Sequence, residues 1–200
     1  MNIANKLVFA ALLLVVLISK VSAQTPNDLE PPPNPFSWVG DVWIDERGAK
    51  CSEHYENYKF VVCIRETHYS FSGNTFFQIQ VNMEQSSPIE DALAEAYTRM
   101  GWSFKEDGEC FAIVDTVITL PKLEHDQFTK AEIVAKWDAF YDALKHHEYN
   151  HHKISVLGYW NEFKSGCNDP DLASQSVQIL QDEYDAYTNH GRTEGAIFWE

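Results

Sequence analysis

His147 and His151 stand four residues apart, and Glu148 directly follows the first of them. On a helix, residues four apart lie on the same face, so the two imidazoles can bind one zinc ion together. Glu148 then lies beside the metal, where its carboxylate can take a proton from a zinc-bound water. This spacing predicts a zinc site with hydrolytic chemistry.

A long helix over residues 131–164 is expected to carry this motif. The segment lacks proline, its only glycine is Gly158, and Thr129 with Glu132 forms a capping-box pattern at its start. Inward-facing positions recur at three- and four-residue steps. They are Trp137, Phe140, Tyr141, Leu144, His147, His151, Ile154 and Gly158. His146 and His152 fall off this stripe, so we expect them to face solvent.

A catalytic zinc usually has three protein ligands and one open position. We expect the third from a second helix over residues 171–188, which can fold back along the first. His190 is the preferred candidate, although a histidine at a helix C-terminus is also favoured by the helix dipole alone. Asp185 is the next candidate, as a ligand or as a carboxylate that orients a ligating histidine. Glu183 is a third.

Tyr184 lies in the same segment. Its hydroxyl could donate a hydrogen bond to a developing oxyanion, which would make it catalytic together with Glu148. A tyrosine that only packs in the core is the alternative. Three other histidines lie outside both helices, and we expect them to be structural or on the surface. They are His54, His68 and His125.

The first residues resemble a secretory signal peptide. Lys6 precedes an apolar run over residues 7–18, and small residues end at Ala23. We therefore expect a signal peptide over residues 1–23, with an uncleaved anchor as the alternative. A proline-rich linker over 24–37 and a single domain over 38–200 follow. The expected location is secreted or periplasmic, without stable membrane insertion.

Composition limits the partners. The net charge is −15, so the chain lacks the basic surface that nucleic acid requires. The acidity could help cationic substrates approach, but it does not specify them. We expect a peptide or protein substrate. The sequence leaves the oligomeric state open.

Four cysteines in an exported chain suggest two disulfides. Of the three possible connectivities we favour Cys51–Cys63, which closes a short loop, together with Cys110–Cys167. Zinc ligation by cysteine is disfavoured because no two cysteines have C-x-x-C spacing.

The remaining segments predict an α+β fold, in which a small antiparallel sheet packs against the long helix and the C-terminal helix. Strand-like patterns cover residues 58–71, 101–105 and 110–120, with Pro121 expected to end the last of these. Residues 75–84 suggest a short helix, and the alanine-rich residues 88–98 suggest another.

Several short blocks together resemble a known family. They are Tyr69-Ser70-Phe71-Ser72-Gly73, Tyr97-Thr98-Arg99 with Trp102, Cys110 leading into Thr119-Leu120-Pro121, Trp137 with the His147–His151 motif, Cys167, and Tyr184-Asp185-x-x-Thr188-x-His190-Gly191-x-x-Glu194-Gly195. With these blocks, residues 58–198 resemble the predicted secreted zinc-dependent proteases, a bacterial family catalogued as domain of unknown function 922. The resemblance implies a zinc-dependent peptidase and supports the Cys110–Cys167 pairing. The chain departs from the family pattern at Tyr149 and Asn150, where smaller residues are usual.

Three hypotheses follow. The first is a secreted zinc metallopeptidase of the endopeptidase type, in which Glu148 activates the water. The second is a non-peptidase zinc amide hydrolase that acts on cell-envelope material. The third is a non-catalytic binding protein in which zinc staples two helices. A closed four-ligand site would favour the third, an open site beside a groove would favour an enzyme, and an exposed strand along that groove would favour a peptide substrate.

Overall fold

The computed structural model describes residues 42–55, 59–90, 92–104, 110–125, 129–164 and 170–198. The expected signal peptide and proline-rich linker lie outside these residues. The described helices are α1 (Phe76–Ser86), α2 (Ala131–Lys164) and α3 (Pro170–Thr188), and a 3₁₀ turn, η1 (Arg192–Glu194), follows. The expected α+β class is confirmed, and both long helices lie where the sequence pattern predicts them. None of the described helices has the length and apolar content that a membrane-spanning helix requires.

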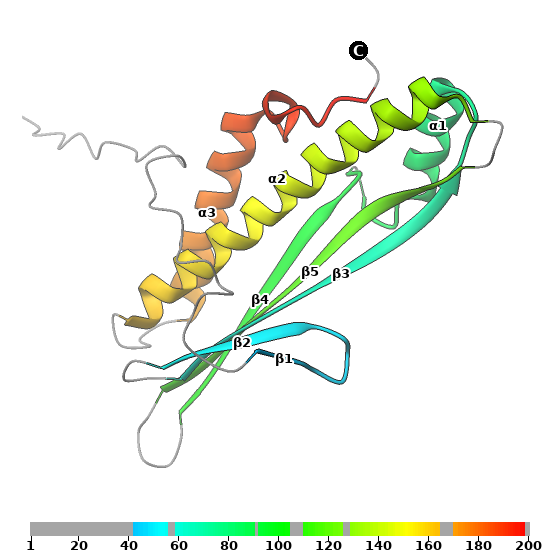
Figure 1. The fold of residues 1–200 in the computed structure, drawn as a ribbon. Coiled ribbons are helices and arrows are strands. Elements are labelled where there is room, and N and C mark those ends of the chain that lie inside the picture. Colours follow the sequence, from blue (N-terminus) through cyan, green and yellow to red (C-terminus); the bar gives the residue numbers. More distant parts are fainter. Residues whose placement is uncertain are drawn as a thin grey trace, which may run out of the picture. The chain divides into compact units, whose positions relative to one another are not determined.

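The described strands form one five-stranded sheet in the order β1-β2-β3-β5-β4 (Figure 1). They are β1 (Val42–Ile44), β2 (Lys50–Tyr55), β3 (Lys59–Ser72), β4 (Glu95–Phe104) and β5 (Cys110–Glu124). The expectation of a purely antiparallel sheet is wrong, because β3 and β5 pair in parallel. The chain passes from β3 through α1 to β4, which lies two positions away, and β5 then returns between them. β5 therefore pairs antiparallel with β4 and parallel with β3.

The predicted helix over residues 88–98 is also wrong, since Glu95 begins β4. Alternation is what decides this segment: Ala96, Thr98 and Met100 are half-buried, whereas Tyr97 and Arg99 are exposed. That period of two matches a strand with one covered face, and it outweighs the helix propensity of the alanines.

Pro121 does not end β5, which continues to Glu124. The helix α2 begins after Lys130, whose carbonyl accepts from the Val134 amide. The hydroxyl of Thr129, the expected cap residue, donates to Asn74 Oδ1 at 2.8 Å.

The favoured disulfide Cys51–Cys63 is confirmed. The two residues are direct partners in the antiparallel β2–β3 pairing, and both are buried. The link therefore joins adjacent strands. The expected Cys110–Cys167 pair lies outside the described residues, because Cys167 and the Cys110 side chain are not described.

Helix α2 lies across one face of the sheet, and α3 packs beside it (Figure 1). One buried cluster joins β3, β5, α2 and α3, and includes Phe60, Val114, Val156 and Val177. A second cluster joins α1, the sheet and the first half of α2. Because α2 is covered by the sheet on one side and by α3 on another, it has two buried faces.

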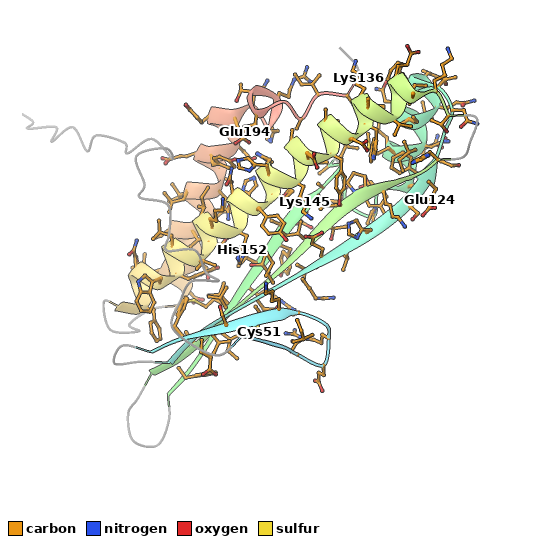
Figure 2. The ribbon with its side chains drawn as sticks, viewed as in Figure 1. Cys51, Glu124, Lys136, Lys145, His152 and Glu194 are labelled. Carbon is orange, nitrogen blue, oxygen red and sulfur yellow. A yellow bond between two sulfur atoms is a disulfide. The ribbon has the colours of Figure 1, made fainter. Side chains whose placement is uncertain are left out.

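The second buried face explains why the expectation for His152 is wrong. His146 is exposed as predicted, but His152 is buried between α2 and the sheet (Figure 2). Its Nδ1 lies 2.8 Å from Thr116 Oγ1, and its Nε2 has no hydrogen-bond partner among the described residues. Burial, with a smaller contribution from Lys153, lowers the pKa of His152 to about 4 from a usual value of 6.5.

This buried histidine predicts a pH-dependent stability. Between about pH 6.5 and pH 4 the unfolded chain binds a proton at His152 that the folded chain does not, so the folded state loses stability as the pH falls. The loss is about 3 kcal/mol. We expect urea unfolding in the presence of a chelator to show this loss in the wild type and not in His152→Gln. Parallel pH profiles for the two proteins would contradict this assignment.

Candidate metal centre

His147 and His151 on α2 face Asp185 on α3. The Nε2 atoms of the two histidines are 3.1 Å apart, and Asp185 Oδ1 lies 3.2 Å from the first and 3.0 Å from the second. Two consecutive helices thus bring three electron-pair donors to one point. These residues form a group whose geometry could hold a metal ion.

The other ring nitrogen of each histidine is already engaged. His147 Nδ1 lies 2.8 Å from Glu194 Oε2, and His151 Nδ1 contacts Gln181 Oε1. The orientation of the Gln181 amide is set by its NH₂ group, which donates to the His151 carbonyl and to Ser155 Oγ. Both acceptors therefore require that Nδ1 of each histidine carries the proton.

This tautomer leaves a lone pair on Nε2 of both histidines, pointing toward a carboxylate oxygen. Three lone pairs at about 3 Å repel one another unless a proton or a metal cation lies between them. Ligand atoms of a tetrahedral zinc, each at 2.0–2.1 Å from the metal, are about 3.3 Å apart. The measured separations are close to that value, so the donor set fits a metal ion such as zinc.

The pKa values of these residues reflect the same repulsion between electron pairs. Burial opposes the charge of Asp185, but hydrogen bonds from His147 and His151, which form when their Nε2 atoms carry a proton, outweigh it and hold the pKa of Asp185 well below its usual value. Burial likewise opposes a charge on His147, yet Asp185 and Glu194 raise the pKa of His147 above its usual value. Both shifts show that this pocket stabilises positive charge between the ligand atoms.

Glu148 lies next to the first ligand and is 5% exposed. Among the described residues its carboxylate has no hydrogen-bond partner, and it lines the groove that also holds the metal ligands. Burial, only partly offset by the two nearby histidines, raises the pKa of Glu148 to about 7. A carboxylate with this pKa can both accept and release a proton near neutral pH.

Tyr184 contacts both His147 and Glu194. Its ring stacks on His147 with centroids 5.1 Å apart, and its hydroxyl donates to Glu194 at 2.7 Å. Asn150 in turn donates to the Tyr184 hydroxyl at 2.9 Å. Burial and the neighbouring Glu194 carboxylate raise the pKa of Tyr184, so this hydroxyl stays protonated. Tyr184 is buried and does not line the groove, which places it as a support for His147 and Glu194.

His190 is not brought into the three-residue group. Its side chain is 79% exposed, and its Nδ1 lies 3.7 Å from Asp185 Oδ1. The geometry thus places Asp185, the second candidate from the sequence, where His190 was preferred. Glu183 is exposed on α3 and also lies outside the group.

Glu194 and Gln181 are the functional residues that sequence reasoning missed. The chain leaves α3 through left-handed backbone at Asn189, His190 and Gly191. This reversal brings Glu194 (Figure 2) back to His147, whose Nδ1 lies 2.8 Å from Glu194 Oε2. A Cβ on Gly191 would lie 3.1 Å from Cγ of His147, so a larger residue would press on the ligand. The His190-Gly191 pair before Glu194 was the available sequence signal.

Phe198 anchors the far side of this turn. Its ring is fully buried and packs against Phe76, Trp137 and Phe140 with centroid separations of 5.5–5.6 Å. The segment that carries Glu194 is therefore held at both ends.

The two unusual residues inside the motif point away from the groove. Tyr149 donates to Glu66 on β3 at 2.5 Å, and Lys145 pairs with the same carboxylate at 2.8 Å. Asn150 joins the Tyr184 network described above. Neither residue lines the groove, so their size leaves it open. His68 is also structural, as expected, and lies 3.1 Å from the Tyr141 hydroxyl.

The ligands open onto a groove with a volume of about 1380 Å³. Its described walls are α2, α3 and β4, and β4 is the edge strand of the described sheet. The arrangement thus leaves one side of the three-donor group accessible, as a metal that binds a substrate requires.

The ligand assignment predicts different effects at two neighbouring residues. We expect Asp185→Ala to weaken zinc binding by more than about 100-fold, because it removes a ligand atom, whereas His190→Ala weakens it less than about tenfold. Competition with a fluorescent chelator measures both. A larger loss in His190→Ala than in Asp185→Ala would return His190 to the ligand set.

Glu194 should raise the affinity of the site for zinc through its contact with His147. We expect Glu194→Gln to lower zinc affinity by about 10–100-fold, since the amide accepts the Nδ1 proton less strongly. Glu183→Gln, which removes an exposed carboxylate on α3, is the matched control and should bind like the wild type. Near-UV circular dichroism confirms that each variant is folded. Equal affinities in the two variants would remove Glu194 from the site.

Comparison with known proteins gives one match. The family model described as a bacterial protein of unknown function (DUF922) matches residues 66–162. No curated protein and no solved structure matches the chain. The matched segment includes both ligating histidines and Glu148 but ends before α3, so it is shorter than the resemblance over 58–198 and excludes Asp185 and Glu194. Over residues 66–162 the chain is therefore similar to the bacterial family of unknown function DUF922, the family that the sequence blocks indicated.

Proposed function

We propose that this protein is a zinc-dependent hydrolase that cleaves peptide bonds within extended polypeptides. One observation carries the proposal: three converging donors with committed Nδ1 protons lie beside a buried, unpartnered Glu148 in an open groove. A metal site that only staples helices has no need for such a carboxylate.

When bound, a zinc ion would act as a Lewis acid that polarises a substrate carbonyl and lowers the pKa of water. The protein supplies the proton transfers. Glu148 accepts a proton from the attacking water and passes it to the leaving amine. The burial that raises its pKa also limits its contact with bulk water during this transfer.

Ligand number and accessibility favour an enzyme over a stapled binding protein. The described group offers three ligand atoms, and a closed structural zinc site has four. The groove beside the ligands leaves room for a substrate carbonyl and a water.

The shape of the groove favours a peptide over another amide. It runs along the edge strand β4, where an extended chain can pair with the free strand edge. Along α2 it extends from Phe140 to Tyr159, about 10 Å before His147 and about 12 Å beyond His151. That length takes about three extended residues on each side of the metal, which suits an internal bond. The alternative, an amide of cell-envelope material, would use the same centre.

Two further aspects of the proposal rest on separate features. Two histidines and a carboxylate suit zinc, but they also suit iron(II), so metal analysis of the purified protein must accompany every assay.

The proposed export of the protein rests on the expected signal peptide over residues 1–23. It agrees with the Cys51–Cys63 disulfide, since such bonds persist in oxidising compartments.

Glu148→Gln is the direct test. We expect the variant to fold and to keep its zinc, but to lose about 10²–10⁴-fold in hydrolysis of a mixed peptide library, because the amide cannot accept a proton. Product release measured by mass spectrometry gives both the rate and the cleaved bonds. Glu183→Gln again serves as the control.

Three outcomes would separate the hypotheses. A wild-type protein that binds no metal would contradict the proposed zinc dependence and with it the whole proposal. A zinc-loaded wild type that cleaves cell-envelope amides but no peptide favours the alternative hydrolase. Equal inactivity of wild type and Glu148→Gln on every substrate favours the non-catalytic binding protein.

A further inference from the structure

The groove extends along one edge of β4. In a strand, side chains alternate between two faces, so a cavity over one face touches every second residue. Here six consecutive residues of β4, 95–100, line the groove, together with the two residues before the strand. The groove therefore follows the edge of the strand, where its unpaired backbone groups lie. β4 pairs with β5 along its other edge, and no described strand covers this one.

The two remaining walls are helix faces. Residues of α3 line the groove at three- and four-residue steps, from Ser174 through Val177 and Gln181 to Asp185. Residues of α2 also line the groove at three- and four-residue steps, and the candidate metal ligands His147 and His151 lie near the middle of this stretch. A space bounded by two helices and one free strand edge fits a single extended chain, which can form backbone hydrogen bonds with β4.

The two ends of the groove differ in charge. Ala96, near the start of β4, packs in the cluster that contains α1, whereas Met100 packs near Tyr159. Around the start of β4 the groove is lined by three carboxylates, Glu84, Glu90 and Glu95, all exposed.

The opposite end carries fewer carboxylates. Tyr159, Ser174 and Gln178 lie there, together with Arg99, which is 3.7 Å from Asp115. Asp182, which also lines the groove, accepts a hydrogen bond from Gln178 at 2.8 Å. Arg192 also lines the groove. Carboxylates outside the metal centre thus outnumber cations on the described lining, and three of them gather at one end.

We propose that this groove binds an extended peptide that pairs with β4 and places a lysine or arginine side chain at the Glu84/Glu90/Glu95 end. The proposal deepens the proposed function, on which it rests, by naming the substrate class. Peptide backbone pairing provides affinity without sequence preference, whereas the three carboxylates select a basic residue at a defined distance from the metal. An acidic side chain at that end would meet three like charges.

Binding to zinc-loaded Glu148→Gln tests this without requiring cleavage. Four labelled octapeptides share a Val/Thr-rich sequence: one has two lysines near its N-terminus, one has them near its C-terminus, and one each has glutamine or glutamate at both places. We expect one of the two lysine peptides to bind about tenfold tighter than the glutamine peptide, and the glutamate peptide to bind more weakly than any other. Fluorescence anisotropy gives the Kd values. Equal affinity for both lysine peptides would mean diffuse attraction and would overturn the subsite.

Matched charge variants locate the subsite. Glu84→Gln/Glu90→Gln/Glu95→Gln should abolish the preference for lysine. Glu46→Gln/Glu132→Gln/Glu183→Gln changes net charge equally at exposed sites outside the groove and should retain it. An equal loss in both triple variants would overturn the assignment.

N-methylated peptides test the pairing with β4. Methylation of alternate backbone nitrogens should abolish binding in one register and leave it unchanged in the other, because only every second amide of a paired strand faces its partner. Equal affinities for the two methylated peptides would overturn strand pairing.

Selective binding without cleavage by the wild type would leave this inference standing and remove the proposed peptidase. Cleavage without lysine preference would do the reverse.

Discussion

The convergence of two imidazole nitrogens on one carboxylate oxygen is the constraint on which the rest of this structure depends. His147 and His151 commit their Nδ1 protons to Glu194 and Gln181, so their Nε2 lone pairs face Asp185 at 3.0–3.2 Å. Such an arrangement is unfavourable without positive charge between the three atoms. The helix pairing and the C-terminal turn both hold these groups together, so the fold itself maintains a group that could hold a metal ion.

Each supporting element contributes a different part of this arrangement. The hydrophobic cluster around Val156 and Val177 sets the distance between α2 and α3, and with it the distance from the histidines to Asp185. Gly191 allows the chain to pass close to His147 so that Glu194 can reach it. Tyr184 fills the space beneath and joins Glu194 to Asn150. The acidic partners are thus placed by packing, and the charge of the site follows from that placement.

Burial separates the roles of the carboxylates in and around the groove. When their Nε2 atoms carry a proton, His147 and His151 hold Asp185 ionised by hydrogen bonds, whereas Glu148 lacks such partners and its pKa rises to about 7. Glu84, Glu90 and Glu95 remain exposed at one end of the groove and are suited to attract a cationic side chain. In the proposed function one chemical group, the carboxylate, would supply a metal ligand, a proton acceptor and a surface for recognition, according to how much water and which partners each side chain meets.

The sequence alone was sufficient for features that depend on local spacing. It determined the long helix, the pairing of His147 with His151, the second helix and the Cys51–Cys63 link, because helical periodicity and a short loop between cysteines are visible along the chain. Tertiary structure decided what depends on neighbours distant in sequence. The parallel β3–β5 pairing and the strand at Glu95 reflect sheet packing. His152 is buried because α2 is covered on two sides. Asp185 and Glu194, rather than His190, reach the histidines because the third contributor is set by how α3 packs on α2 and how the chain turns after it, and no spacing within the sequence encodes that distance.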